Sequence, residues 1–128
     1  MRLPRHAGVW FAGFTLWFCT LWWLSSRVHH VPPPLTFQAS DKVLHFGYFL
    51  GGAGLLSAAL FRWKPERAPW MHVAVVTLIV TLVGVLDEYH QSLVPGRHGN
   101  DIYDLTADFL GALTGALLFL PFRRLFAD

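Results

Sequence analysis

Residues 86–118 read LDEYHQSLVPGRHGNDIYDLTADFLGALTGALL, and this stretch decides the fold. Its second half is apolar enough to cross a membrane, yet Asp104 and Asp108 lie inside that half. A charge at the centre of a bilayer costs roughly 2.5–3.5 kcal/mol on insertion scales, so such groups normally face the interior of a helix bundle. The stretch therefore predicts a membrane-spanning helix whose acidic face is buried against other helices.

The composition of the chain agrees with a small integral membrane protein. Its 128 residues are 54% hydrophobic and only 14% charged, with a mean hydropathy of +0.42. Soluble domains carry about 25% charged residues. The net charge of +2 is too small to indicate a nucleic-acid partner. We expect a single membrane domain over residues 1–128, and no oligomeric state follows from the sequence.

Four windows meet the length that a spanning helix requires, about 17–20 mostly apolar residues. They are residues 7–26, 43–61, 70–86 and 102–122. The first window follows two arginines, as a signal peptide would. It is longer than an h-region of about 7–15 residues and no small-x-small cleavage site follows it, so we expect it to be retained. The predicted fold class is all-α, a four-helix transmembrane bundle.

Basic residues are divided unevenly between the two sides of such a bundle. Seven lie on the side of the termini and the second loop: Arg2, Arg5, Arg62, Lys64, Arg67, Arg123 and Arg124. Three lie on the other side: Arg27, Lys42 and Arg97. Because cytoplasmic segments carry the excess of Lys and Arg, both termini are predicted to be cytoplasmic. Trp17, Trp22 and Trp23 are expected to form a lipid-facing or interfacial belt.

This topology brings the start of the second span, the end of the third and the start of the fourth to one membrane level. Residues three or four apart share a helix face. One such face of the fourth span carries Asp101, Asp104, Asp108, Gly111 and Gly115. Its two glycines should let another helix approach closely. The candidate site residues are Asp41, Lys42, His45, Tyr48, Glu88, Gln91, Arg97, Asp104 and Asp108. Asp41, Lys42 and Asp101 lie at helix starts, where capping or solvation is the simpler interpretation.

Three stretches resemble a known family: SDKVLHFGYFLGGAGLL at 40–56, DEYHQSLVPGR at 87–97 and DLTADFLGALTGALL at 104–118. Their order of Asp-Lys-x-x-His-Phe, Asp-Glu-x-x-Gln, Pro-Gly-Arg and Asp-x-x-x-Asn/Asp-x-x-Gly is similar to that of the VanZ-like family of bacterial membrane proteins. The resemblance implies a multi-pass protein of the bacterial cytoplasmic membrane. It also marks the candidate residues as the family's polar positions, with Tyr48 near a frequent tyrosine and position 108 often Asn. The family name comes from a member that lowers susceptibility to teicoplanin, so a resistance role in the cell envelope is implied by resemblance alone.

Two classes of function fit these residues. In the first, the protein binds a membrane lipid or a lipid-linked, glycolipid or lipoglycopeptide ligand. Lys42 and Arg97 would hold an anionic group of that ligand, and Gln91 and His45 would donate hydrogen bonds. A structural polar network between helices is the simpler alternative. A proton-coupled carrier is a weaker one, because four short spans without an inverted repeat make a poor transporter.

In the second class, the protein is a membrane-embedded hydrolase or transferase that acts on a lipid-linked substrate. Glu88 or Asp108 would be the general base, Asp104 with His45 would orient water, and Arg97 would stabilise developing negative charge. Neither Gly-x-Ser-x-Gly nor His-Glu-x-x-His occurs in the sequence. A metal held by His45, Glu88 and Asp104 is not favoured because the ligand set is not rich in histidine. We therefore expect no metal and no other cofactor.

Overall fold

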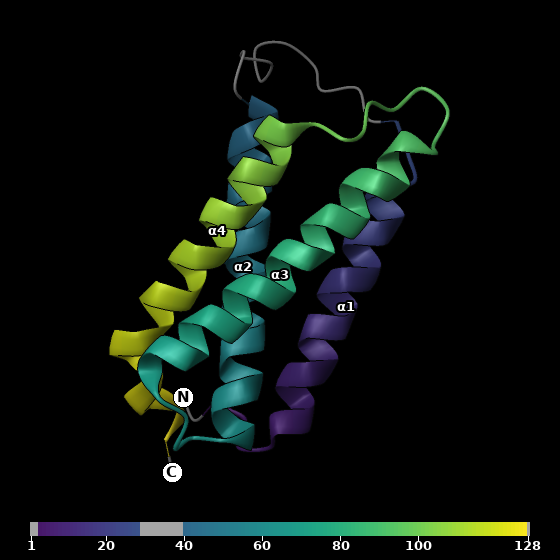
Figure 1. Ribbon diagram of the computed structural model, residues 1–128. Helices are drawn as coiled ribbons and strands as arrows, with labels where there is room; N and C mark the ends of the chain where they lie inside the picture. Colours follow the sequence, from purple (N-terminus) through teal and green to yellow (C-terminus); the bar gives the residue numbers. More distant parts are fainter. Residues whose placement is uncertain (1–2, 29–39, 128) are drawn as a thin grey trace.

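The computed structural model describes residues 3–28 and 40–127, which form a bundle of four long helices (Figure 1). The helices are α1 (Ala7–Ser25), α2 (Ser40–Trp63), α3 (Pro69–Ser92) and α4 (Ile102–Phe122), and the 3₁₀ helix η1 (Arg123–Phe126) follows α4. The described residues contain no β-strand, and all four helices are long and apolar enough to cross a membrane. The predicted all-α fold with four spanning helices is confirmed.

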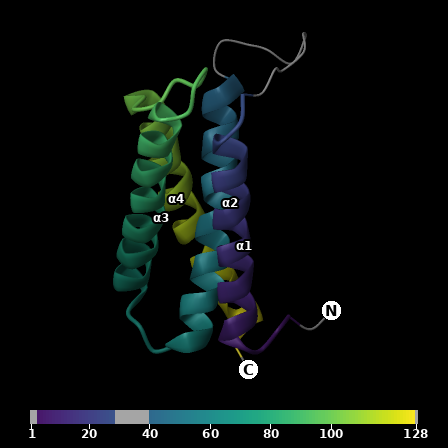
Figure 2. The ribbon, with the colours of Figure 1, turned by 90° about the vertical axis from the view of Figure 1, so that its right-hand side faces the viewer.

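Helix α2 lies at the centre of the bundle and contacts each of the other three helices. Its most extensive contact is with α4, while α1 packs mainly against α2 and α3 packs mainly against α4 (Figures 1 and 2). The described chain begins and ends at the same end of the bundle (Figure 1). We call this the basic end. The opposite end, where α1 and α3 finish and α2 and α4 begin, we call the acidic end. Which side of the membrane each end faces stays a prediction.

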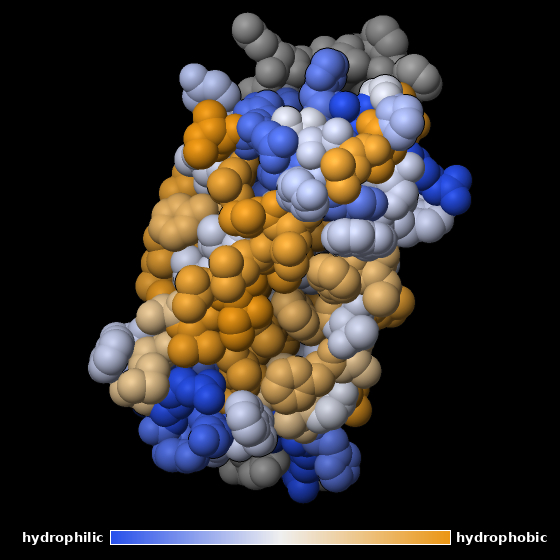
Figure 3. Space-filling model, turned by 45° about the vertical axis from the view of Figure 1, so that its right-hand side comes forward, coloured by the Kyte–Doolittle hydropathy of each residue, from blue (hydrophilic) through white to orange (hydrophobic). Residues whose placement is uncertain are grey.

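The surface between the two ends is apolar. Figure 3 shows a hydrophobic belt across the middle of the molecule, with hydrophilic residues gathered at both ends. Large exposed side chains such as Leu78, Leu82 and Leu118 contribute to this belt. In water such a surface would be an aggregation hazard, whereas a bilayer solvates it. The exposed charge of the molecule is thus gathered at the two ends of the bundle.

Two helices extend further than the hydropathy windows predicted. Helix α2 begins at Ser40 rather than at residue 43, and α3 continues to Ser92 rather than stopping at 86. Asp87 to Gln91 were expected in the connecting loop but occupy the last two turns of α3. A helix predicted from hydropathy ends at the first charged residue. The real helix can continue past that residue where neighbouring helices provide partners for its polar side chains. Pro69 is the first residue of α3, where a backbone N–H would have no partner within the helix, so the missing N–H of proline costs nothing.

The close approach predicted for the glycines of α4 is confirmed. A Cβ on Gly111 would run into the carbonyl oxygen of Phe46, and one on Gly115 would lie 2.5 Å from the carbonyl oxygen of Leu50. Both obstacles belong to the backbone of α2, so neither can move aside as a side chain would. The glycines therefore set the short distance between α2 and α4, and this distance brings the acidic end together.

The prediction of a lipid-facing tryptophan belt is wrong for Trp17. Its indole is buried over Gly52, where it leaves no room for a Cβ, and Nε1 donates a 3.0 Å hydrogen bond to the carbonyl oxygen of Tyr48. The Tyr48 hydroxyl donates back to the carbonyl oxygen of Trp17 at 2.8 Å. This reciprocal pair ties α1 to α2. Trp22 and Trp23 are exposed, as expected.

Candidate functional site

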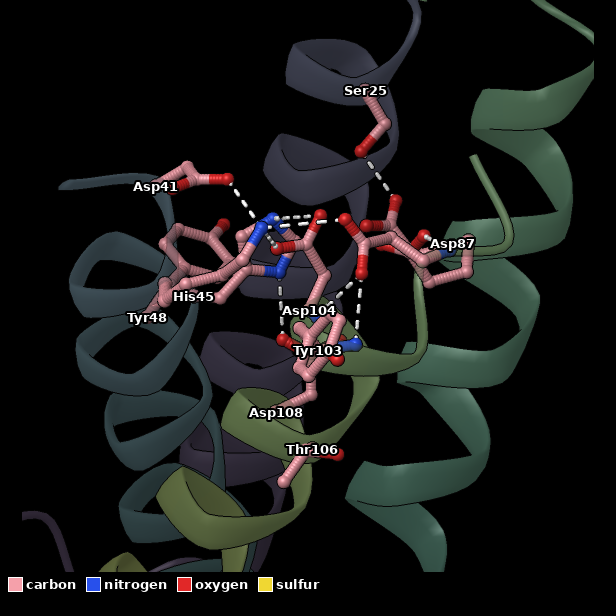
Figure 4. A network of polar contacts seen from close by, with 12 residues as sticks. Ser25, Asp41, His45, Tyr48, Asp87, Tyr103, Asp104, Thr106 and Asp108 are labelled. Carbon is pink, nitrogen blue, oxygen red and sulfur yellow. Dashed lines mark hydrogen bonds and ion pairs between the residues drawn. The ribbon is translucent and has the colours of Figure 1, made fainter. Parts of the chain in front are cut away.

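The acidic end holds six of the chain's eight acidic residues: Asp41, Asp87, Glu88, Asp101, Asp104 and Asp108. Four of them are buried inside the bundle: Asp87, Glu88, Asp104 and Asp108. Figure 4 shows Asp104, Asp108 and His45 turned toward one another between α2 and α4, with Asp87 approaching from α3. The candidate residues that the sequence placed at one membrane level thus lie close together in space.

His45 and Asp108 form the deepest pair of the site. His45 Nδ1 lies 2.8 Å from Asp108 Oδ1, and the Asp108 side chain is fully buried. An ionised Asp108 can only accept, so with that carboxylate a neutral His45 carries its proton on Nδ1 and has a free lone pair on Nε2. Gly84 of α3 makes room for the pair, because a Cβ there would lie 2.8 Å from Asp108 Oδ2. The contact therefore sets the direction of the His45 ring.

Lys42 lies among three carboxylates. Its Nζ is 2.5 Å from Asp41, 2.6 Å from Asp104 Oδ1 and 3.3 Å from Asp101. Asp104 is buried, whereas the side chains of Asp41 and Asp101 are 55% and 36% exposed. Lys42 therefore links the interior of the site to its surface. Carboxylates of the protein already neutralise the charge of Lys42. This weakens the prediction that Lys42 holds an anionic group of a ligand.

Glu88 enters the site from α3, and the connecting loop folds back onto it. The backbone N–H of Asp101 donates to Glu88 Oε2 at 2.9 Å, and the backbone N–H of Asn100 donates to the Glu88 carbonyl oxygen at 3.2 Å. Gly99 allows this return, because a Cβ there would collide with the backbone of Ser92 and Glu88. The other oxygen, Glu88 Oε1, is buried and accepts no hydrogen bond from the described residues.

Asp101 caps α4 as the sequence predicted. Its side chain accepts from the backbone N–H groups of Tyr103 at 2.8 Å and Asp104 at 3.4 Å. These backbone hydrogen bonds, joined by the one from Lys42, favour the ionised form and lower the pKa of the Asp101 carboxyl below its usual range. Asp101 thus fixes the first turn of α4, from which Asp104 projects into the site.

Asp87 is a site residue that the sequence analysis did not select. It is almost fully buried, and it accepts hydrogen bonds from Ser25 of α1 and from Gln91 Nε2 at 2.8 Å. Gln91 Oε1 in turn accepts a 2.7 Å bond from Arg97, whose other terminal nitrogen donates to the Arg27 carbonyl oxygen at 2.8 Å. A signal was present in the sequence, since Asp87 lies four residues before Gln91 on one helix face. Nothing in the sequence indicated the partner from α1.

The structure therefore divides the predicted residues into three groups. Lys42, His45, Glu88, Asp104 and Asp108 form the centre of the site, in which the three acids are buried. Gln91 and Arg97 belong to the adjoining Asp87 network. Asp41 lies at the exposed rim, and Tyr48 points its hydroxyl to α1 rather than to the acids.

The chemistry of the site follows from its charge. Six carboxyl groups share this end with only three Lys or Arg side chains, and two of those, Lys42 and Arg97, already pair with protein oxygens. The ligand atoms of His45, Glu88 and Asp104 all lie within 4.8 Å of one another. Such a site accepts protons, hydrogen-bond donors or a cation, and it repels a free anion.

The comparisons with known proteins identify the family. No curated protein and no solved structure matches the chain. The VanZ/LLP1 family model matches residues 8–126, a range that includes α1 as well as the three helices of the sequence motif. The chain belongs to the VanZ/LLP1 family.

Proposed function

We propose that the protein binds the saccharide-bearing head group of an amphiphilic lipid at the acidic end, on the outer side of the bacterial cytoplasmic membrane. The observation that carries the proposal is an excess of carboxylates buried within a membrane-spanning bundle and open to the surface along one edge. Sugar hydroxyls are hydrogen-bond donors, and carboxylates accept the stronger, charge-assisted hydrogen bonds. A glycolipid or another lipid-linked saccharide therefore suits the site better than an anionic phospholipid does.

The exposed edge of the site supports the proposal of a lipid-linked saccharide ligand. Asp41 and Asp101 stand at the rim with Lys42 between them, at the starts of α2 and α4. Exposed apolar side chains lie next to the same rim, notably Leu44 and Tyr103. A head group bound by the carboxylates would thus keep its acyl chains beside apolar surface.

An apolar groove supports binding of the hydrophobic part. It has a volume of about 390 Å³ and lies along α2 and α4, between Leu50, Gly54, Gly115 and Leu118, with aromatic side chains of α1 and the C-terminal segment at its lower end. The groove and the rim share the α2–α4 pair. A lipid that runs along this pair would place its chains in the groove and its head group at the acids.

Lipid retention by the purified protein tests the proposal. Native mass spectrometry would compare a monoglucosyl diacylglycerol with phosphatidylglycerol and phosphatidylethanolamine of identical acyl chains. We expect the glucolipid to be retained best, and Asp101→Asn to reduce its retention about fivefold, since a hydrogen bond to a charged acceptor contributes about 1 kcal/mol more than one to a neutral acceptor. Glu66→Gln, an exposed charge removed from the basic end, is the matched control. Equal retention of phosphatidylglycerol, or equal effects of the two variants, would contradict the proposal.

The resistance role implied by the family name is a narrower form of the same proposal, with a lipoglycopeptide as the ligand. Expression in a susceptible Gram-positive host, with the teicoplanin concentration that inhibits growth as the readout, checks it. An unchanged inhibitory concentration would exclude a lipoglycopeptide as the ligand and would leave the proposal of a glycolipid ligand standing.

A second candidate function is acid–base chemistry on the bound lipid. The observation that favours it is the His45–Asp108 pair, which leaves Nε2 of His45 facing Asp104 at 3.8 Å with Glu88 beside it. A histidine oriented by a carboxylate is a common general base. Loss of the sugar from the glucolipid during incubation, abolished by Glu88→Gln while retention persists, would support catalysis over simple binding.

A further inference from the structure

We propose that His45, Glu88 and Asp104 form a binding site for one divalent transition-metal ion, Zn²⁺ or Mn²⁺. The three residues come from three different helices, α2, α3 and α4, and offer one nitrogen and two carboxylate oxygens. The sequence alone did not favour a metal on these residues, so the inference rests on their geometry, and it does not depend on the proposed saccharide ligand.

The distances fit coordination of one ion. His45 Nε2 and Asp104 Oδ2 are 3.8 Å apart, and the ligand atoms of all three residues lie within 4.8 Å of one another. A Zn²⁺ ion binds nitrogen and oxygen at about 2.0–2.2 Å, so two of its ligands are separated by about 3–4 Å. Small rotations of the side chains therefore suffice to bring the three atoms onto one ion.

The hydrogen bond on the far side of His45 is the arrangement that metal-binding histidines use. Nδ1 is held by Asp108 at 2.8 Å, so Nε2 presents its lone pair to the other two residues. Metal-ligating histidines nearly always give their second ring N–H to a carboxylate or a carbonyl, which fixes the tautomer and raises the basicity of the ligand nitrogen. Asp108 supplies this carboxylate from full burial.

Glu88 gives a second, independent observation that points to a ligand. Only 3% of its surface is exposed, and its Oε1 accepts no hydrogen bond from any residue that the structure describes. A buried carboxylate oxygen without a partner is strongly destabilising, because it has lost water and gained nothing. Coordination of a cation removes this penalty. Glu88 Oε2 stays bonded to the backbone of Asp101, which holds the carboxylate in place for a ligand.

Lys42 does not block the site. It contacts Asp104 through Oδ1 at 2.6 Å, while Asp104 faces His45 through Oδ2. One oxygen can thus bind the metal as the other stays paired with the ammonium group.

The ligand set of one imidazole and two carboxylates indicates which metal would bind. It suits Zn²⁺ and Mn²⁺, both of which accept nitrogen and oxygen ligands, and it disfavours Ca²⁺, which takes six to eight oxygens. With three protein ligands, further coordination positions remain for water or a hydroxyl group.

Metal titration of the full-length protein tests the proposal. The protein would be purified in detergent, stripped with a chelator, and titrated with Zn²⁺, Mn²⁺, Mg²⁺ and Ca²⁺ by calorimetry. We expect one saturable site per chain for Zn²⁺ or Mn²⁺, tighter than for Mg²⁺ or Ca²⁺, and a rise in melting temperature on binding. Pulsed electron paramagnetic resonance of the Mn²⁺ form should show a directly bound imidazole nitrogen, which His45→Gln should remove.

Matched variants separate coordination from general attraction to negative charge. Glu88→Gln and Asp104→Asn each remove one ligand charge, whereas Asp41→Asn removes the same charge from the rim of the cluster. We expect either ligand variant to weaken binding at least tenfold more than Asp41→Asn does. If one ligand variant fails to fold, the other carries the comparison. No saturable binding to the wild type, or similar losses in ligand and rim variants, would overturn the proposal.

Discussion

Replacing Gly111 by alanine tests the contact that assembles the acidic end. The added Cβ would collide with the backbone carbonyl group of Phe46, so α2 and α4 must move apart. Forcing one extra carbon into a packed interface costs about 1–3 kcal/mol. Alanine also favours a helix over glycine by about 1 kcal/mol, which offsets part of that loss. The net expectation is a destabilisation of about 0–2 kcal/mol.

Gly51→Ala is the matched control, because this glycine lies in α2 and a Cβ there would meet nothing within 4 Å. It should leave stability unchanged or raise it by up to about 1 kcal/mol. Unfolding by SDS in mixed micelles, followed by circular dichroism, gives the two free energies. If Gly111→Ala were as stable as Gly51→Ala, the glycine would not set the distance between α2 and α4.

Three further outcomes follow from the geometry. In a cysteine-free background, His98→Cys should react with a membrane-impermeant thiol reagent in intact cells; labelling only after lysis would reverse the predicted orientation. Ser25→Ala, which removes a donor from the buried Asp87 carboxylate, should cost about 1.5–3 kcal/mol of unfolding free energy. Ser26→Ala should cost little, because its exposed hydroxyl donates to the carbonyl oxygen of Trp22 and otherwise makes only a long 3.4 Å contact with His90. Asp101 has a lowered pKa, so its ionised cap stabilises the fold above the unfolded pKa and is lost as the pH falls through the folded pKa. Melting curves should therefore fall more steeply below about pH 4 in the wild type than in Asp101→Asn, which keeps a capping oxygen but does not titrate.

Periodicity and loop charge predicted the helices and the level of the site because both depend on local pattern. Asp104 and Asp108 lie four apart with Gly111 and Gly115 beyond them, and this spacing alone predicted which face of α4 is buried. The alternation of four spans predicted which helix ends lie together at each end of the bundle, whereas the Lys and Arg distribution predicted which end is cytoplasmic, and that orientation stays a prediction. These parts of the fold can be predicted without knowing how the helices are rotated against one another.

Pairings between helices could not be read from the sequence in the same way. Ser25 is 62 residues from Asp87, and its role appears only when α1 packs beside α3. Trp17 looked like an interfacial residue because its neighbours are aromatic, whereas Gly52 on α2 provides the space that buries it. The sequence presented Lys42 and Arg97 as cations that could hold either an anionic ligand group or a carboxylate of the protein. Their protein partners, Asp104 and Gln91, became visible only with the geometry.

The buried acids favour a functional over a purely structural interpretation of the site. A network that only joined helices would be most stable with every oxygen paired, and apolar residues would often serve equally well. Asp87 fits a structural role, because Ser25 and Gln91 satisfy both of its oxygens. Glu88 and Asp108 do not, since each keeps one buried oxygen without a hydrogen bond from the described residues. Glu88 lies beside His45 and Asp104, and the open oxygen of Asp108 lies against Gly84 of α3. A site in which such acids hold a cation, or accept hydrogen bonds from the hydroxyl groups of a head group, offsets the cost of burying them.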